Sequence, residues 1–197
     1  DHLPRLPESG AGTIAVPRTA VQIAPQGVFI AYNAAETPDS PAARAPQSRP
    51  VPAMHFNRFG LEFDYPENWS VDTDDSQDRY ATVTVYSPEG GFWSVSGHAA
   101  GGEPAALSQA VLRQMKKEYQ DLDSEPAGEL VGGLQLAGCD MNFYCLDLTN
   151  TAQVRTLETP DAIYLFFCQA EDREWDRIAP VFAAMTASFI AALPHDD

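Results

Sequence analysis

The chain has 197 residues, which suits one domain with an appendage or at most two small domains. Its hydrophobic content of 44% is ordinary for a globular protein and can form a core without disulfides or a metal. The formal net charge of −16 at pH 7 repels phosphate backbones, so nucleic acid is not expected as a partner. The same charge disfavours contact with an anionic membrane surface.

The negative charge is unevenly distributed along the chain. Residues 1–53 hold four basic and four acidic side chains, so the whole negative excess lies in residues 54–197. A charge of this size keeps a protein soluble, which is the simpler interpretation. Alternatively, it marks a docking face for a basic protein or for cations.

The proline content divides the chain into two parts. Nine of the 16 prolines lie in residues 1–53, which we interpret as a Pro/Ala-rich N-terminal arm and linker. The β-like pieces at 13–16, 20–24 and 28–32 are candidates to add an edge strand to the main body or to a partner. Residues 54–197 are interpreted as one domain. No run of 18 apolar residues occurs, so no membrane insertion is predicted.

The first half of the domain shows the alternating pattern of β-strands. Apolar residues alternate with polar or small ones over 59–65, which predicts a strand with one buried face. An acidic loop is predicted at 72–78. Strands at 80–86 and 92–99 are expected to form a hairpin around the turn Ser87–Gly91.

Two helices are predicted in the second half of the domain. The first begins at Pro104, because apolar side chains recur every four residues from Leu107 to Tyr119. The second covers about 171–193, where apolar residues repeat at intervals of three and four. Since Pro180 would remove an internal hydrogen bond, we expect a short first turn and a main helix that starts near Pro180.

Several strands lie between these helices. They are predicted at Leu130–Leu136, Cys139–Leu148, Gln153–Glu158 and Ala162–Gln169, with turns at 149–151 and 159–161. The order strand, hairpin, helix, meander and helix predicts an α+β fold, in which helices pack on a mainly antiparallel β-sheet as an α/β/α sandwich. The aromatic side chains expected in the core are Phe59, Phe63, Tyr65, Trp69 and Trp175.

The residue types form no recognisable catalytic group. His98 follows Ser94 and Ser96, but serines inside a strand with this glycine spacing do not match a nucleophile elbow. Cys145 and Cys168 lie in apolar strands, which favours buried, free thiols over nucleophiles. We therefore expect no enzymatic activity and no cofactor. A serine or cysteine bonded to His98, with a carboxylate behind the histidine, would revive an enzymatic interpretation.

The acidic loop holds the best candidate for a ligand site. Asp72, Asp74, Ser76 and Asp78 alternate as the oxygen ligands of a calcium loop do. The three aspartates therefore predict a weak divalent cation site. Gln77 stands where the sharp-turn glycine of such a loop belongs, and Val83 where its bidentate glutamate belongs. A solvated polar loop is therefore the competing interpretation.

Three segments of the domain resemble PsbP-like proteins. Phe59–Trp69 (FGLEFDYPENW) is similar to the family's opening aromatic-x-aromatic-x-Tyr-Pro-x-x-Trp motif. Tyr164–Trp175 is similar to its last strand and helix entry, and Phe182–Phe189 to its final helix. The sequence of Asp140–Thr151 also resembles that of uncharacterised bacterial members, notably planctomycetal ones.

This resemblance implies an accessory role. The family includes extrinsic subunits of photosystem II, a Ran-binding import factor and bacterial envelope proteins, which share docking to a larger partner. We therefore expect a non-enzymatic, acidic accessory domain that docks to a protein partner, with a membrane complex as one candidate. We expect it in the bacterial envelope or on the extracytoplasmic side. The alternatives are an extrinsic subunit of a membrane photosynthetic or redox complex, and an envelope protein that binds a small ligand or a divalent cation.

Overall fold

Nine strands and two helices make up residues 52–74 and 81–194, the parts of the chain that the computed structural model describes. In chain order they are β1 (Ala53–Arg58), β2 (Leu61–Pro66), β3 (Ser70–Asp74), β4 (Thr82–Tyr86), β5 (Phe92–Ala99), α1 (Pro104–Glu118), β6 (Asp123–Val131), β7 (Leu134–Cys145), β8 (Leu148–Glu158), β9 (Ala162–Glu171) and α2 (Asp172–Ala192). Residues 1–51 lie outside the described parts, so the arm, its β-like pieces and the domain boundary stay predictions.

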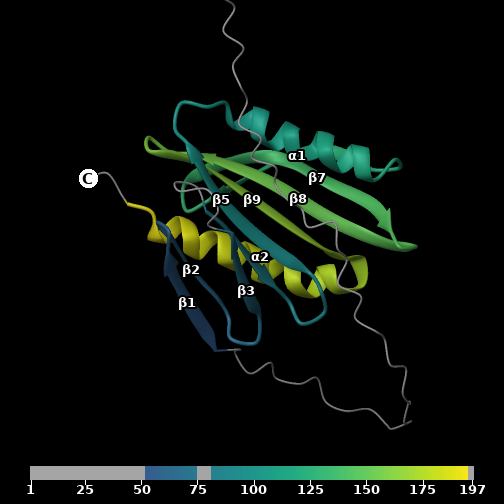
Figure 1. The fold of residues 1–197 in the computed structure, drawn as a ribbon, viewed down its shortest axis with the longest axis horizontal. Helices are drawn as coiled ribbons and strands as arrows, with labels where there is room; N and C mark the ends of the chain where they lie inside the picture. The colour runs from purple at the N-terminus through teal and green to yellow at the C-terminus, as the bar shows by residue number, and fades with distance from the viewer. Residues whose placement is uncertain (1–51, 75–80, 195–197) are drawn as a thin grey trace, which may run out of the picture. The chain divides into compact units, whose positions relative to one another are not determined.

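The strands form two antiparallel sheets. The larger has the order β3-β4-β5-β9-β8-β7-β6, and β1 pairs with β2 in a separate hairpin. Figure 1 shows that hairpin beside α2 and away from α1. The predicted α+β class, a mainly antiparallel sheet with helices packed on it, is confirmed.

The helices cover opposite faces of the large sheet, because side chains alternate between the two faces along each strand. Phe143 of β7 contacts Tyr119, just after α1, with ring centroids 4.2 Å apart. Phe166 of β9 packs against Phe189 of α2 at 5.3 Å. The main core therefore lies between the sheet, α2 and the β1–β2 hairpin, and the α1 side forms a second, thinner layer.

Trp93 of β5 lies at the centre of the main core and is 1% exposed. Its ring meets that of Phe63 from β2 edge-on at 4.9 Å. Its indole N–H donates a 2.9 Å hydrogen bond to the hydroxyl of Thr186 on α2. One side chain thus joins the sheet, the small hairpin and the helix.

Three hairpins have two-residue connections in which both residues have positive φ: Phe59-Gly60, Gly132-Gly133 and Leu146-Asp147. This is the requirement of type I′ turns, whose twist matches that of the flanking strands. Two predictions were wrong for this reason. The strand predicted over 59–65 begins at Leu61, because Phe59 lies in the turn. The turn expected at 149–151 lies instead at Leu146-Asp147.

Other strands also differ from those expected. β1 was not predicted, because Phe56 is its one buried side chain and no alternation marks it. β6 begins at Asp123 and not near 130, since most of this edge strand is exposed and polar. Residues 72–74 of the predicted acidic loop belong to β3, because Thr and Val side chains of β3 and β4 pair across the hairpin.

The final helix is continuous, so the expected start near Pro180 is wrong. α2 begins at Asp172 and includes Pro180. The missing proline N–H costs one hydrogen bond, but the first turns are fixed by tertiary contacts of Glu174 and Ile178, which are both buried.

The predicted aromatic core is correct except at one position. Phe63 and Trp69 are buried, while Tyr65 and Trp175 are partly buried against the same cluster. Phe59 is 41% exposed, because it occupies the β1–β2 turn and does not lie in the strand.

Candidate functional site

An open groove lies between α1 and the β6–β7–β8 end of the sheet. Its volume is about 750 Å³, within the range of ligand-binding clefts. Lining residues are Glu103, Pro104, Ala105, Ser108, Gln109 and Leu112 beside or on α1, Ser124, Glu125 and Pro126 on β6, Gln135, Ala137, Gly138 and Cys139 on β7, and Thr156 and Glu158 on β8.

Small side chains explain why this space is open. α1 packs over β7, β8 and β9, and β6 lies beyond its reach at the edge of the sheet. Pro126 and Gly128 on β6, and Ala137 on β7, are too small to fill the volume beneath the helix. A Cβ atom added at Gly128 would lie 2.9 Å from the carbonyl oxygen of Leu136. The close pairing of β6 with β7 therefore favours glycine at this position.

The groove is apolar in its floor and acidic at its rim. Ala137 and Cys139 form the floor, and Leu112 of α1 lies above them. Glu103 and Glu158 are exposed at the rim. Among the described residues that line the groove, none is basic. The site therefore suits a ligand with apolar groups and positive charge.

β6 extends the groove to the free edge of the sheet. It pairs with β7 on one side and, within the described residues, with no strand on the other. Leu130 pairs in register with Gln135, which lines the groove, and its side chain is 69% exposed. An exposed leucine thus continues the apolar surface along the edge strand.

The opposite face of β6 is acidic. Because side chains alternate along a strand, Asp123, Glu125 and Glu129 share the face of β6 opposite that of Leu130, and Glu125 also borders the groove. All three are exposed. Glu129 lies 3.5 Å from Nε of Arg155, whereas Asp123 and Glu125 form no ion pair with any described residue.

A buried arginine supports this corner of the sheet. The guanidinium of Arg155 on β8 donates hydrogen bonds to the carbonyl oxygen of Cys139 at 3.0 Å and to Asp140 at 2.6 Å, both on β7. Its side chain is 8% exposed, and Nε has no hydrogen-bond partner among the described residues. A cavity of about 40 Å³ lies beside it under α2, large enough for a water molecule. Arg155 thereby joins β6, β7 and β8.

Ser96 and His98 lie on one face of β5, with Ser96 Oγ 2.9 Å from Nε2 of His98. Burial lowers the pKa of His98, which favours the neutral ring. No carboxylate contacts the other ring nitrogen among the described residues. The pair therefore meets one condition of a catalytic group and, in the described part of the chain, lacks the orienting acid.

The cysteines are free, as predicted. Burial raises the pKa of Cys168 to about 12 and also raises that of Cys139, so both stay protonated thiols near neutral pH. Cys145 is half-buried and not part of the core, 3.9 Å from the hydroxyl of Tyr119. Burial, with the nearby thiol, raises the pKa of Tyr119 to about 12.

The predicted cation ligands are only partly visible. Asp72 and Asp74 lie on β3, with exposed side chains on one face of the strand. Asp72 accepts a hydrogen bond from the backbone N–H of Thr73 at 2.9 Å. Asp78 lies outside the described residues. No group of three metal-ligating side chains occurs in 52–74 and 81–194, so the cation site stays a prediction.

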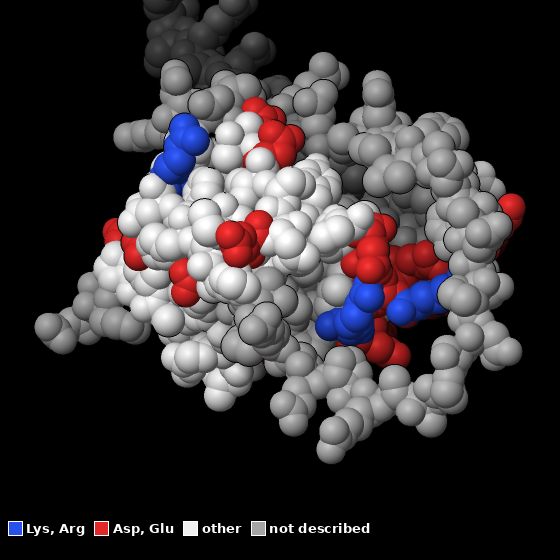
Figure 2. Space-filling model, turned by 90° about the horizontal axis from the view of Figure 1, so that it is seen from below, with Lys and Arg blue, Asp and Glu red and all other residues white. Residues whose placement is uncertain are grey.

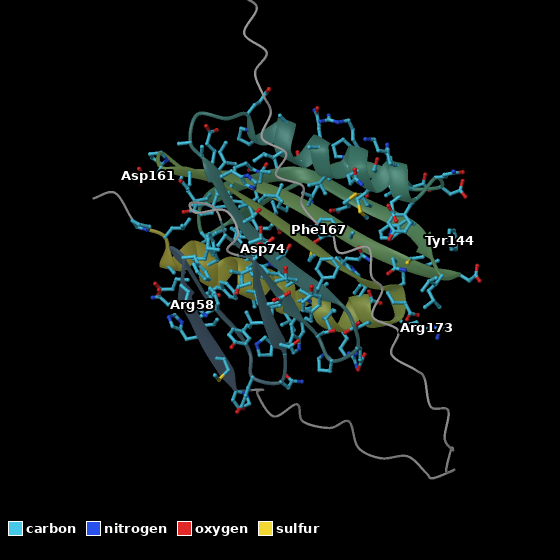
Figure 3. The ribbon with its side chains drawn as sticks, in the orientation of Figure 1. Arg58, Asp74, Tyr144, Asp161, Phe167 and Arg173 are labelled. Carbon is cyan, nitrogen blue, oxygen red and sulfur yellow. The ribbon has the colours of Figure 1, made fainter. Side chains whose placement is uncertain are left out.

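A second exposed apolar group lies at the tip of the β7–β8 hairpin. Tyr144, Leu146 and Leu148 are 65%, 79% and 40% exposed. Figure 3 shows Tyr144 at the opposite end of the sheet from Asp161. Leu146 combines this exposure with φ of +50°, two unfavourable features for leucine.

Two arginines of α2 form ion pairs at the surface. Arg173 pairs with Glu171 at 3.3 Å, and Arg177 pairs with Glu89 and Glu174. In Figure 2, the basic groups at the right of the view lie against acidic ones, and other acidic groups are spread over this face. Neither helix in the described ranges is long and apolar enough to cross a bilayer.

Sequence reasoning missed the groove and the whole of β6 before Leu130. A signal was present, because acidic residues at 123, 125 and 129 alternate with small or apolar ones at 124, 126, 128 and 130. Pro126 obscured it, since proline within a run argues against a central strand and is compatible with an edge strand.

Comparison with known proteins gives structural neighbours but no family. No protein-family model matches the chain, and no curated protein does. Among solved structures, the chain is similar to cyanobacterial PsbP from Synechocystis sp. PCC 6803, with 12% identity and a TM-score of 0.49 over 76% of this chain and 98% of that one.

Two further neighbours come from other bacteria. One is a Pseudomonas aeruginosa protein of unknown function and putative regulator, with 11% identity and a TM-score of 0.43 over 74% of this chain and 99% of that one. The other is LpqN, involved in cell envelope biogenesis of Mycobacterium tuberculosis, with 13% identity and a TM-score of 0.40 over 71% of this chain and 83% of that one.

Proposed function

We propose that this protein is a non-enzymatic accessory domain that docks to a larger protein partner through the groove between α1 and the β6 edge. The observation that carries the proposal is the groove itself. It is an open, mainly apolar volume of about 750 Å³ that extends to the edge of β6 on which no described strand pairs. An open groove of this kind accepts part of another chain more readily than a molecule that must be enclosed.

Two further features support docking over catalysis. Leu130 exposes 69% of its surface beside the groove, an arrangement typical of interaction surfaces. The thiols of Cys139 and Cys168 have raised pKa values, which disfavours the thiolate that a nucleophile requires. Ser96 and His98 are the best candidates for a catalytic site. If the protein acts by docking, Ser96→Ala should leave its binding to the partner unchanged.

Site-specific photo-crosslinking tests the proposal. A benzophenone amino acid replaces Ala137 on the groove floor, or, as the control, the exposed Glu67 in the β2–β3 turn. In cells of the source organism, we expect a discrete protein adduct from position 137 and none from position 67. The same adducts from both positions, or none from 137, would contradict docking through the groove.

A second candidate function follows from the size of the groove. Its volume lies within the range of small-ligand sites, and its floor is apolar. This favours the alternative of a protein that binds a small, partly apolar molecule. Native mass spectrometry of the purified protein decides between the two, because a bound metabolite adds a fixed mass that Ala137→Trp should remove.

A further inference from the structure

We infer that the partner supplies an extended segment that alternates basic and apolar residues and adds to the sheet as a strand beside β6. This inference rests on the proposed docking function and names the chemistry of what docks. It follows from three properties of β6: its free edge, its two unlike faces and its charge.

The free edge offers backbone hydrogen bonds. β6 spans nine residues, Asp123–Val131, and pairs only with β7 among the described strands. Pro126 lies within the ladder opposite Cys139 and has no N–H to give to β7. Its nitrogen therefore belongs on the free side, and so do the N–H groups of residues two positions away. Ser124 accordingly presents its N–H and C=O to an incoming strand.

The two faces of β6 specify alternate side chains of that strand. On the α1 face, Pro126, Leu130 and the groove floor at Ala137 present apolar surface. On the other face, Asp123 and Glu125 present carboxylates that no described basic residue neutralises. A strand added at this edge places successive side chains on these faces in turn. Apolar side chains would enter the groove, while basic ones would meet the carboxylates.

The charge of β6 also excludes a second copy of this chain. An antiparallel pairing of two β6 edges would bring rows of carboxylates together, and like charges opposite one another are destabilising. The same row attracts lysine or arginine. The edge is therefore protected against self-association and open to a basic strand.

A synthetic peptide provides the probe. The nine-residue peptide Val-Lys-Val-Lys-Val-Lys-Val-Lys-Val carries a fluorophore, and binding to the full chain is followed by fluorescence anisotropy. Two controls have the same length: a peptide with the same composition in two blocks, and an alternating Val/Glu peptide. We expect the alternating basic peptide to bind at least about tenfold more tightly than either control. Binding should weaken as salt is raised.

Variants of the protein locate the bound peptide. Asp123→Lys with Glu125→Lys should weaken binding by about tenfold or more through charge. Ser124→Pro should weaken it by removing a backbone donor at the edge of β6, while the charge of β6 stays unchanged. Glu67→Lys, a single charge reversal on a distant turn, is the control for Glu125→Lys alone and should have little effect. Circular dichroism of each variant verifies that the fold is retained.

Clear outcomes would overturn the inference. Equal binding of the alternating and block peptides would show non-specific attraction, and so would equal losses from the β6 and Glu67 variants. No binding of the alternating peptide would also refute it. If a partner still crosslinks at position 137, docking through the groove stands and only the basic strand is wrong. If that adduct is also absent, both proposals fail.

Discussion

Ser87 donates a 2.6 Å hydrogen bond to the carboxylate of Glu174, although 87 positions separate them in the chain. The other oxygen of Glu174 accepts a hydrogen bond from the backbone N–H of Gly91 at 3.2 Å. Glu174 is 6% exposed. The turn between β4 and β5 is thus fixed to the first turns of α2, and a side chain at Gly91 would come within 2.5 Å of Ile178.

Removing this carboxylate should destabilise the fold. Glu174→Ala leaves the Ser87 hydroxyl and the Gly91 N–H without their partner, and should lower the free energy of unfolding by about 2–3 kcal/mol. Glu174→Gln retains the shape and should cost about 1 kcal/mol. Urea denaturation measures both. Asp176→Asn, exposed in the same helical turn, is the control, and a loss for Glu174→Ala no larger than for this variant would contradict the assigned role.

The two described histidines should make stability depend on pH with opposite signs. Burial lowers the pKa of His98, so the unfolded chain takes up a proton first as the pH falls. Stability should therefore decrease as the pH falls through the ordinary histidine value of about 6.5 towards the lower folded value. The hydrogen bond with Asp64, together with Glu62, raises the pKa of the exposed His55. The stabilisation that His55 contributes is present below about pH 6.5. It is lost as the pH rises through the pKa of His55 in the folded protein.

Thermal unfolding between about pH 5.5 and 8 separates the two contributions, in the range around the ordinary histidine pKa. His98→Asn should flatten the loss of stability on the acidic side, while His55→Asn should lower stability on the acidic side and leave the alkaline side unchanged. If His98→Asn left the profile of the parent protein unaltered, burial of its ring would not control its titration.

Thiol reactivity should follow burial. Near pH 8, one thiol, that of the half-buried Cys145, should react rapidly with a disulfide reagent. Cys139 and Cys168 should react only as the protein opens, because both are buried and their pKa values are raised. Cys145→Ser should abolish the fast phase. Rapid labelling of Cys168 in the folded state, detected by peptide mass spectrometry, would refute this assignment.

Substitutions in the β7–β8 turn should stabilise the protein. Leu146 and Asp147 have φ of +50° and +63°, which asparagine and glycine adopt more easily. The double variant Leu146→Asn with Asp147→Gly should raise the free energy of unfolding by about 1 kcal/mol. Leu148→Asn removes an exposed leucine without relieving positive φ and should give no such gain. Equal stabilities of the double variant and the parent, measured by urea denaturation, would show that the turn is not strained.

The sequence by itself determined the fold class and most of the core. Helix α1 and strands β4, β5 and β9 were predictable because their apolar periodicity is local and strong. The burial of Phe63 and Trp69 followed from the same patterns. The free cysteines were also predictable, since the spacing of Cys139 and Cys145 on one strand prevents a disulfide.

The tertiary structure decided the features that depend on distant residues. An edge strand such as β6 lacks a buried face and therefore leaves no clear period in the sequence. Pro180 stays inside α2 because Glu174 is bonded to Ser87 and Gly91, which no local rule foresees. The groove exists because small residues from α1, β6 and β7 meet in space. Local propensity acts over a few residues, whereas this volume is set by packing between segments far apart in the chain.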